Sequence, residues 1–246
     1  MISVSIVSHS QKDLVLDLFK DFERLKPPLV TQIILTHNLT DDRKEFPDRI
    51  GHIEVSQIYR GTQLGFGANH NRAFTTTSNQ LFAVLNPDLR FEIDPFTRLV
   101  SSLNLISTGL IAPQIVNRDN TVEDSARGLY TPLDSLSGLR RKSRLHRENP
   151  AWIAGMFVLF RSKAFTQING FDERYFMYVE DVDICARLVI AGWSLKYESS
   201  VNVTHLARRE NRKSLTHFVW HLSSALRWWS GRVFWAYRRK LKRASA

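Results

Sequence analysis

The sequence has a single cysteine, Cys185, among its 246 residues, so no disulfide can form within the chain. A cysteine-based zinc site is excluded for the same reason, because such sites need several thiolates. One isolated thiol is typical of a protein from a reducing compartment.

The sequence also lacks a long apolar run, and we expect no leader peptide. No stretch approaches the roughly 20 apolar residues that a membrane-spanning helix needs. The N-terminus leads directly into a strand-like segment, residues 2–7, with no basic leader or cleavage site before it. We therefore expect a cytoplasmic protein that touches a membrane only from the side.

Acidic residues are scarce after His205: the segment contains eleven basic residues and a single acidic one, Glu210. This excess equals the formal charge of +10 for the whole chain, so the remainder is close to neutral. A neutral body with a basic end predicts attraction to a polyanion, either a membrane or a nucleic acid.

The same C-terminal segment has an apolar helical face, made of Leu215, Phe218, Val219, Leu222, Leu226, Trp229 and Val233. A basic amphipathic helix of this kind can lie in a membrane surface. The alternative is a terminal helix that packs on the core and leaves its basic end in water.

Apolar periodicity predicts strands that alternate with helices in the first half of the chain. The expected strands are 2–7, 30–35, 53–58 and 80–85, and the expected helices are 13–25 and 68–77. Such alternation predicts an α/β fold with a mostly parallel central sheet flanked by helices. In the second half we expect strands at 110–116, 152–160, 195–197 and 201–204, a polar segment at 124–150, and a helix at 181–191.

Polar residues follow three of these strands: Ser8 and His9, the segment 36–38, and Asn86-Pro-Asp88. Ligands of parallel α/β sheets bind beyond the carboxyl ends of the strands. A carboxylate there, such as Asp88, can hold a hard divalent ion that in turn binds phosphate oxygens. The alternative is a plain turn, because Asn-Pro and Pro-Asp pairs are common in turns.

Two further sites have side chains suited to chemistry. Glu180 and Asp181 stand at the start of the helix expected at 181–191, where the helix N-terminus favours a charged carboxylate, and Asp181 could act as a general base. They could equally be a helix cap alone. His205 follows a strand and could bind a metal or be purely structural.

The segment Leu64-Gly-Phe-Gly67 with Asn69 and Asn71 is typical of a glycine loop that lets backbone approach a phosphate or a base. Its spacing differs from the dinucleotide-binding fingerprint.

Together these motifs resemble the inverting glycosyltransferases of family 2, which have the GT-A fold, and especially bacterial rhamnosyltransferases of cell-surface glycans. The resemblance covers roughly residues 1–215. Its motifs are Gly65-Phe-Gly67, Leu85-Asn-Pro-Asp88, Trp152-Ile-Ala-Gly155, the run from Gly170 to Arg187, and His205. The run from Gly170 to Arg187 is the most specific, because it joins aromatic residues to an acidic pair over many fixed positions.

The resemblance implies a role for each matching residue. Asp88 and His205 would hold Mg²⁺ or Mn²⁺, and Asp181 would be the base, with Glu180 beside it. Residues expected to contact the nucleotide-sugar are Ser8, His9, Asn38, Gly65, Phe66, Asn69, Asn71, Asn86 and Asp88. Residues expected on the acceptor side are Trp152, Gly155 and Arg127, with the basic loop 140–147 nearby.

The resemblance further implies a GT-A domain over 1–214, with a donor half (1–115) and an acceptor half (116–214), followed by the tail 215–246. The expected reaction moves a sugar, L-rhamnose from dTDP-rhamnose by resemblance, to a polyprenyl-diphosphate-linked glycan of the O-antigen type. The expected location is the inner face of the bacterial inner membrane, with an anionic membrane surface as the partner of the tail. No nucleic-acid partner is expected.

One departure concerns strand two, which is followed by Thr36-His37-Asn38 where the family usually has an aspartate that reads the base. This keeps open a glycosyltransferase-like subunit without activity. A nucleic-acid-binding protein is a second alternative, suggested by the basic, tryptophan-containing tail. A sugar nucleotidyltransferase is a third, although the expected glycines are missing after strand one.

Overall fold

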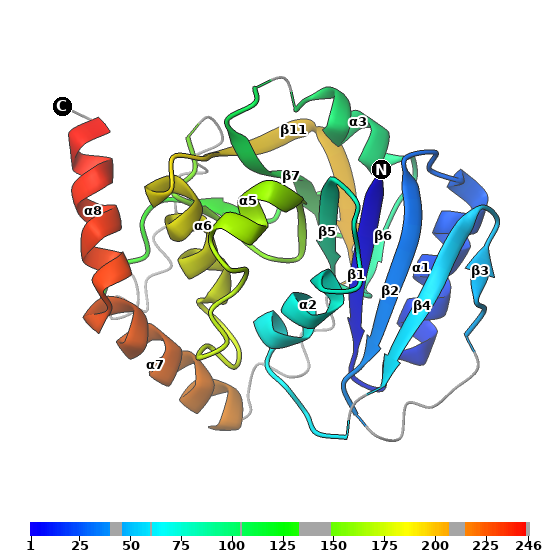
Figure 1. Ribbon diagram of the computed structural model, residues 1–246, viewed down its shortest axis with the longest axis horizontal. Helices are drawn as coiled ribbons and strands as arrows, with labels where there is room; N and C mark the ends of the chain where they lie inside the picture. The colour runs from blue at the N-terminus through cyan, green and yellow to red at the C-terminus, as the bar shows by residue number, and fades with distance from the viewer. Residues whose placement is uncertain (40–45, 60, 104, 133–148, 207–214, 245–246) are drawn as a thin grey trace.

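The computed structural model describes residues 1–39, 46–59, 61–103, 105–132, 149–206 and 215–244. A nine-stranded sheet, with strand order β3-β4-β2-β1-β5-β10-β7-β11-β6, runs through the molecule between two layers of helices (Figure 1). Its strands are β1 (Ile2–Ser8), β2 (Val30–His37), β3 (Arg49–Ile50), β4 (Ile53–Tyr59), β5 (Leu81–Leu85), β6 (Leu89–Arg90), β7 (Thr108–Val116), β10 (Phe157–Arg161) and β11 (Ser194–His205).

Six strands of this sheet point the same way, and β3, β6 and β10 run against them. The expected mostly parallel sheet is therefore confirmed. A separate two-stranded sheet pairs β8 (Ala126–Arg127) with β9 (Trp152–Ile153). The helices are α1 (Lys12–Leu25), α2 (Phe66–Phe74), α3 (Pro95–Ser101), α5 (Ser162–Gln167), α6 (Glu180–Ile190), α7 (Leu215–Ser230) and α8 (Arg232–Ala244).

Side-chain alternation along the strands divides the core into two. In β5, Leu81, Ala83 and Leu85 join one apolar cluster, while Phe82 and Val84 join the other. Helices α1 and α3 cover the first cluster, and α2, α5, α6, α7 and α8 supply the second. The centre of the sheet is thus buried on both faces, which explains why β5 is a continuous apolar run.

Several element boundaries differ from the expected ones. The strand expected at 152–160 is two strands, β9 and β10, separated by residues 154–156. The strands expected at 195–197 and 201–204 are one strand, β11, with a register irregularity between Glu198 and Asn202. Helices α3 and α5 were not expected, because both are too short to show a clear helical period.

The C-terminal segment is not one helix, because α7 ends at Ser230 and α8 begins at Arg232. Figure 1 shows the two helices along one side of the molecule. Trp228 and Tyr237 are fully buried in the second core cluster, together with residues of α6. The segment therefore shares the core of the preceding domain, and only part of its apolar surface remains outside.

None of the helices described is long and apolar enough to cross a membrane.

Candidate functional site

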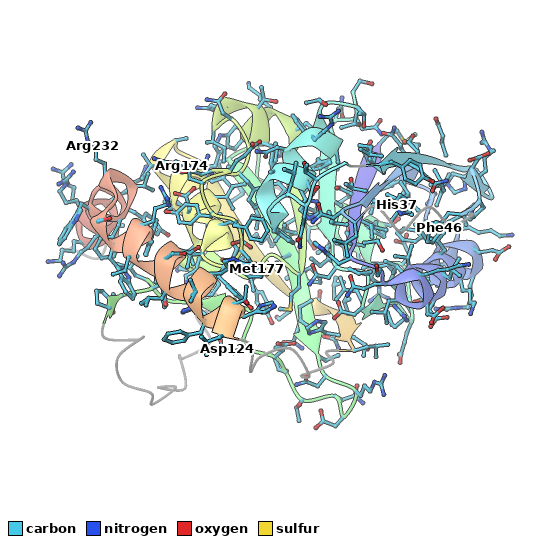
Figure 2. The ribbon with its side chains drawn as sticks, turned by 90° about the horizontal axis from the view of Figure 1, so that it is seen from below. His37, Phe46, Asp124, Arg174, Met177 and Arg232 are labelled. Atoms are coloured by element: carbon cyan, nitrogen blue, oxygen red, sulfur yellow. The ribbon has the colours of Figure 1, made fainter. Side chains whose placement is uncertain are left out.

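The polar segments after β1, β2 and β5 meet at one edge of the sheet. Parallel pairing places Ser8 beside His37 and Ile6 beside Leu85, so these three strands end together. Strand β10 runs the other way and begins at this edge, where Phe157 pairs with Leu85. Figure 2 views the molecule from this side, with His37 and Phe46 at the right, Met177 and Asp124 near the middle, and Arg232 at the left.

Asn38 ties the end of β2 to its neighbours. Its backbone N–H donates to Ser8 O at 3.0 Å. Its side-chain amide donates to Leu64 O at 2.8 Å, and its amide oxygen accepts from Leu64 N at 2.9 Å. The amide also lies 3.3 Å from Nδ1 of His9. The first role that the structure gives Asn38 is therefore to hold the segment that leads into α2.

The glycines of the expected phosphate loop have a packing role within the protein, and their expected contact with a nucleotide-sugar stays a prediction. A Cβ atom at Gly65 would lie 2.5 Å from Phe176 O, and one at Gly67 would lie 2.6 Å from Phe171 Cβ. Phe66 N donates to Phe176 O at 2.9 Å. Helix α2 begins at Phe66 rather than at Ala68, so Gly67 lies within it. The glycines allow α2 to approach the chain's own aromatic segment.

The two asparagines of α2 also bind the protein itself. Asn69 donates from its side chain to Leu64 O and Gly65 O. Asn71 accepts from Phe171 N at 2.8 Å and donates to Phe171 O at 2.9 Å. Asn71 therefore fixes α2 to the loop before α6, while Asn69 fixes the start of α2 to the preceding turn, and their expected contact with a nucleotide-sugar stays a prediction.

His205 lies between two carboxylates at the same edge. Antiparallel pairing of β6 with β11 sets His205 opposite Leu89, next to Asp88. Its Nε2 lies 3.1 Å from Asp88 Oδ2, and its Nδ1 lies 2.8 Å from Glu123 Oε2. Burial alone would lower the pKa of His205, but the hydrogen bonds to Asp88 and Glu123 raise it to about 9. The two expected metal ligands are thus adjacent.

Glu123 was not identified from the sequence. In the structure, the turn Asn117–Thr121, closed by a hydrogen bond from Asn117 N to Thr121 O, returns the chain along β7 and leads to Glu123. Its contact with His205 spans 82 positions, so no spacing rule could have found it.

The Asp88–His205 pair suits a hard or borderline divalent ion. Asp88 Oδ1 is buried and has no hydrogen-bond partner among the described residues, which leaves a carboxylate oxygen available as a ligand. A carboxylate oxygen and an imidazole nitrogen are ligands that Mn²⁺ accepts, and Mg²⁺ favours the former. The described residues contain no group of three or more acidic, His or Cys side chains that could hold a metal by themselves.

Asp181 and Glu180 lie in the first turn of α6, not ahead of it as a cap. The N-cap is Val179, which has a left-handed backbone and makes no side-chain cap. Asp181 accepts hydrogen bonds from Val182 N at 2.9 Å and from Gly155 N at 3.4 Å. Glu180 is only 7% exposed, and its Oε2 has no hydrogen-bond partner among the described residues.

The helix N-terminus led us to expect low pKa values for Glu180 and Asp181, but the pKa values of both are raised. Burial raises the pKa of Asp181, although N–H groups of Val182 and Gly155 and the charge of Arg127 act in the opposite direction. Burial and the neighbouring Asp181 raise the pKa of Glu180 well above its usual value. A raised pKa brings a carboxylate closer to the range in which it can accept a proton near neutral pH.

Of the residues expected on the acceptor side, Gly155 contacts Asp181 directly, and Arg127 acts on it through its charge. A Cβ atom at Gly155 would lie 3.6 Å from Asp181 Cβ and from the ring of Phe66. Arg127 lies over the Trp152 ring, with 5.0 Å between its guanidinium carbon and the ring centroid, and forms a 3.1 Å ion pair with Asp124. The basic loop 140–147 lies outside the described residues.

The metal-ligand pair and the acidic pair are both attached to residues 154–156. Asn86 N donates to Met156 O at 2.9 Å, while Gly155 N donates to Asp181. Residues 154–156 therefore connect the turn before Asp88 to the first turn of α6, and one reaction site shared by Asp88 and Asp181 stays a prediction.

A protein-family model described as "Glycosyltransferase like family 2" matches residues 113–231. The N-acetylglucosaminyl-diphospho-decaprenol L-rhamnosyltransferase of Mycobacterium tuberculosis is 30% identical over 224 residues, covering 76% of this chain and 73% of that protein. Rhamnosyltransferase WbbL of Escherichia coli is 45% identical over 78 residues, which are 31% of this chain and 30% of that protein.

Solved structures with a similar fold include GalNAc-T7 with UDP, GalNAc and Mn²⁺, at a TM-score of 0.69 and 16% identity. Another is the mannosyltransferase PcManGT of Pyrobaculum calidifontis with GDP-Man and Mn²⁺, at 0.67 and 12%. Each similarity covers 92% of this chain, but 47% and 64% of those two chains respectively. The likeness confirms the expected GT-A fold.

Proposed function

The chain belongs to glycosyltransferase family 2, and from this premise we propose that it is an inverting enzyme that transfers a sugar from a nucleotide-diphosphate donor to a lipid-linked glycan. The observation that supports this most strongly is that residues 154–156 contact both the turn before Asp88, through Asn86 N–H and Met156 O, and Asp181, through Gly155 N–H.

Asp181 is the proposed base. Its two oxygens accept from the backbone N–H groups of Val182 and Gly155, which hold the carboxylate in one orientation. It takes the proton of the acceptor hydroxyl as that oxygen attacks the anomeric carbon of the donor. One displacement inverts the anomeric configuration, and a positioned base contributes about 10² to 10⁴-fold to the rate.

Asp88 and His205 are the proposed ligands of a divalent ion, Mn²⁺ or Mg²⁺. When bound, the ion stabilises negative charge on the departing diphosphate. Asn86, Ser8, His9 and Phe66 lie around the same edge and are the proposed contacts to the rest of the donor.

The proposed donor is dTDP-rhamnose and the proposed acceptor a polyprenyl-diphosphate-linked sugar. Both rest on relatives whose names specify a rhamnosyltransferase and, in one case, a decaprenol-linked substrate. Gly155 lies beside Asp181, the charge of Arg127 acts on Asp181, and Arg127 lies over the Trp152 ring; these three residues are the proposed acceptor contacts.

The Asp181→Asn variant tests the reaction. Loss of the base predicts a fall in kcat of about 10² to 10⁴-fold, with the dissociation constant of the donor changed little. Sugar transfer would be measured with the lipid-linked acceptor, and donor binding by calorimetry. Asp13→Asn, which removes an exposed carboxylate in α1, is the matched control. Unchanged turnover in Asp181→Asn would remove this residue from the mechanism, and donor binding without any turnover in the wild type would favour the inactive-subunit alternative.

An anionic membrane surface is the proposed partner of the C-terminal segment. Helix α7 exposes one apolar stripe, with exposures of 82% at Leu215, 66% at Phe218, 54% at Val219, 44% at Leu222 and 56% at Leu226. These positions follow helical spacing, and the segment 215–244 has basic residues but no acidic one. Apolar side chains beside uncompensated positive charge are complementary to anionic lipid. We infer that the protein is peripheral at the inner face of the inner membrane.

Paired substitution on the stripe tests this membrane contact better than deletion of the segment, because deletion would also remove the core residues Trp228 and Tyr237. Phe218→Asp with Leu222→Asp should weaken binding to vesicles containing phosphatidylglycerol at least tenfold, since each buried side chain contributes about 1.5–3 kcal/mol. Ile106→Asp, at an 88% exposed residue before β7, is the control. Equal sedimentation of both variants with the vesicles would refute the proposed surface.

A further inference from the structure

We propose that Glu123 is the positioning residue of His205, fixing the imidazole so that Nε2 faces the ion-binding side of Asp88. This inference rests on the proposed function, because it concerns the same ion site. Glu123 follows the turn Asn117–Thr121 after β7 and belongs to none of the sequence motifs described above.

The first support is the geometry of the three side chains. Glu123 Oε2 lies 2.8 Å from Nδ1 of His205, on the opposite side of the ring from Nε2, which lies 3.1 Å from Asp88 Oδ2. A neutral histidine carries its proton on only one ring nitrogen, and a carboxylate at Nδ1 retains that proton there. With no ion bound, Nε2–H donates to Asp88; in the neutral ring that an ion requires, the proton kept on Nδ1 by Glu123 would leave the lone pair on Nε2.

The second support is the backbone that holds Glu123. Its N–H donates to Ile115 O at 2.9 Å, and Val122 forms a bridge with Val116. Val116 is paired with Thr204, the residue before His205. Both partners are therefore anchored to neighbouring strand ends, and the carboxylate is presented to the ring by regular sheet structure.

The third support is the contrast between the two carboxylates. Asp88 Oδ1 is buried without a hydrogen-bond partner among the described residues, which suits a direct ligand. Glu123 contacts the far nitrogen of the ring and so acts through His205. A carboxylate that accepts from a metal-bound histidine orients the ring and increases its basicity, and its loss typically lowers metal affinity 10- to 100-fold.

The test is titration of the full-length protein with Mn²⁺ alone, followed by the electron paramagnetic resonance signal of the free ion. Glu123→Leu, which cannot accept a hydrogen bond, should weaken Mn²⁺ binding 10- to 100-fold. Glu123→Gln, whose amide oxygen can still accept from Nδ1–H, should weaken it less. Glu54→Gln and Glu54→Leu, at an exposed residue of β4, are the matched controls and should bind Mn²⁺ as the wild type does.

A double-variant cycle separates positioning from simple charge attraction and from a structural role. In a His205→Ala background, Glu123→Leu should have no further effect on Mn²⁺ affinity, because the imidazole that Glu123 orients is already absent. An equal effect in both backgrounds would overturn the proposal, as would a Glu123→Leu protein that loses thermal stability but binds Mn²⁺ normally.

The same titration distinguishes this inference from the proposed function. Mn²⁺ binding that is lost in Asp88→Asn and His205→Ala but kept in Glu123→Leu would overturn the role of Glu123 alone. A wild-type protein that binds no Mn²⁺, alone or with dTDP, would overturn the ion site and the inference together.

Discussion

Asn38 belongs to the segment after strand two where the family resemblance led us to expect an aspartate. At position 38 the structure supplies a physical reason: the side chain both donates to Leu64 O and accepts from Leu64 N. An aspartate could accept the second hydrogen bond but would repel the Leu64 carbonyl oxygen. Asn38 is therefore matched to the segment that leads into α2.

Glu180 is a residue whose burial costs stability at neutral pH. Its folded-state pKa is raised above the ordinary 4.5, so the folded protein binds this proton more tightly than the unfolded chain. Linkage then requires that wild-type stability falls as pH rises through the window above 4.5.

Glu180→Gln should remove this loss. We expect its melting temperature to exceed that of the wild type at pH 8 by about 2–4 °C for each kcal/mol recovered, and the difference to vanish as the pH falls below 4.5. Calorimetry from pH 4 to 8 measures it, with Glu54→Gln as the exposed control. A constant difference across that range would show that titration of Glu180 is not the cause.

At the scale of single elements, α2 shows packing overriding helix propensity. Gly67 lies inside the helix, where alanine would be favoured by about 1 kcal/mol. A Cβ at this position would lie 2.6 Å from Phe171 Cβ, on the segment that leads to α6. Overpacking of this kind costs about 1–3 kcal/mol. For alanine at position 67, this steric cost outweighs the gain in helix propensity.

Gly67→Ala should therefore destabilise the protein by about 1 kcal/mol and lower activity, because α2 and the loop before α6 move apart. Gly61→Ala is the control, since a Cβ there meets nothing within 4 Å. Denaturant unfolding measures both variants. A more stable Gly67→Ala protein would mean that the segment from Phe171 to Phe176 relaxes freely and does not fix α2.

At the scale of the whole molecule, the C-terminal helices have one face buried in the core and another exposed on the surface. The inner face of the pair buries Trp228, Phe234 and Tyr237 against the second core, and Tyr237 donates to Ala151 O beside β9. The outer face of α7 is the exposed apolar stripe. The expected boundary between the domain 1–214 and the tail 215–246 thus lies between two segments that share one hydrophobic core.

Trp228→Ala should destabilise the protein by about 3–5 kcal/mol, the usual cost of truncating a buried aromatic side chain. Trp235→Ala, at a side chain that is 47% exposed, should cost far less. Thermal unfolding of the two variants makes the comparison. Equal melting temperatures would indicate that α7 and α8 do not contribute to the cooperative fold.

The sequence by itself indicated the α/β class, the polar segments that follow the first, second and fourth expected strands, and, with the family resemblance, the residues Asp88, Asp181 and His205 as a candidate set. Those features are local: apolar period, turn residues and motif order can be read along the chain. The tertiary structure alone decided that Gly65 and Gly67 face Phe176 and Phe171, that burial raises the pKa of the acidic pair, that Glu123 reaches His205, and which face of α7 stays exposed. Each of these depends on contacts between residues far apart in sequence, which no local pattern encodes.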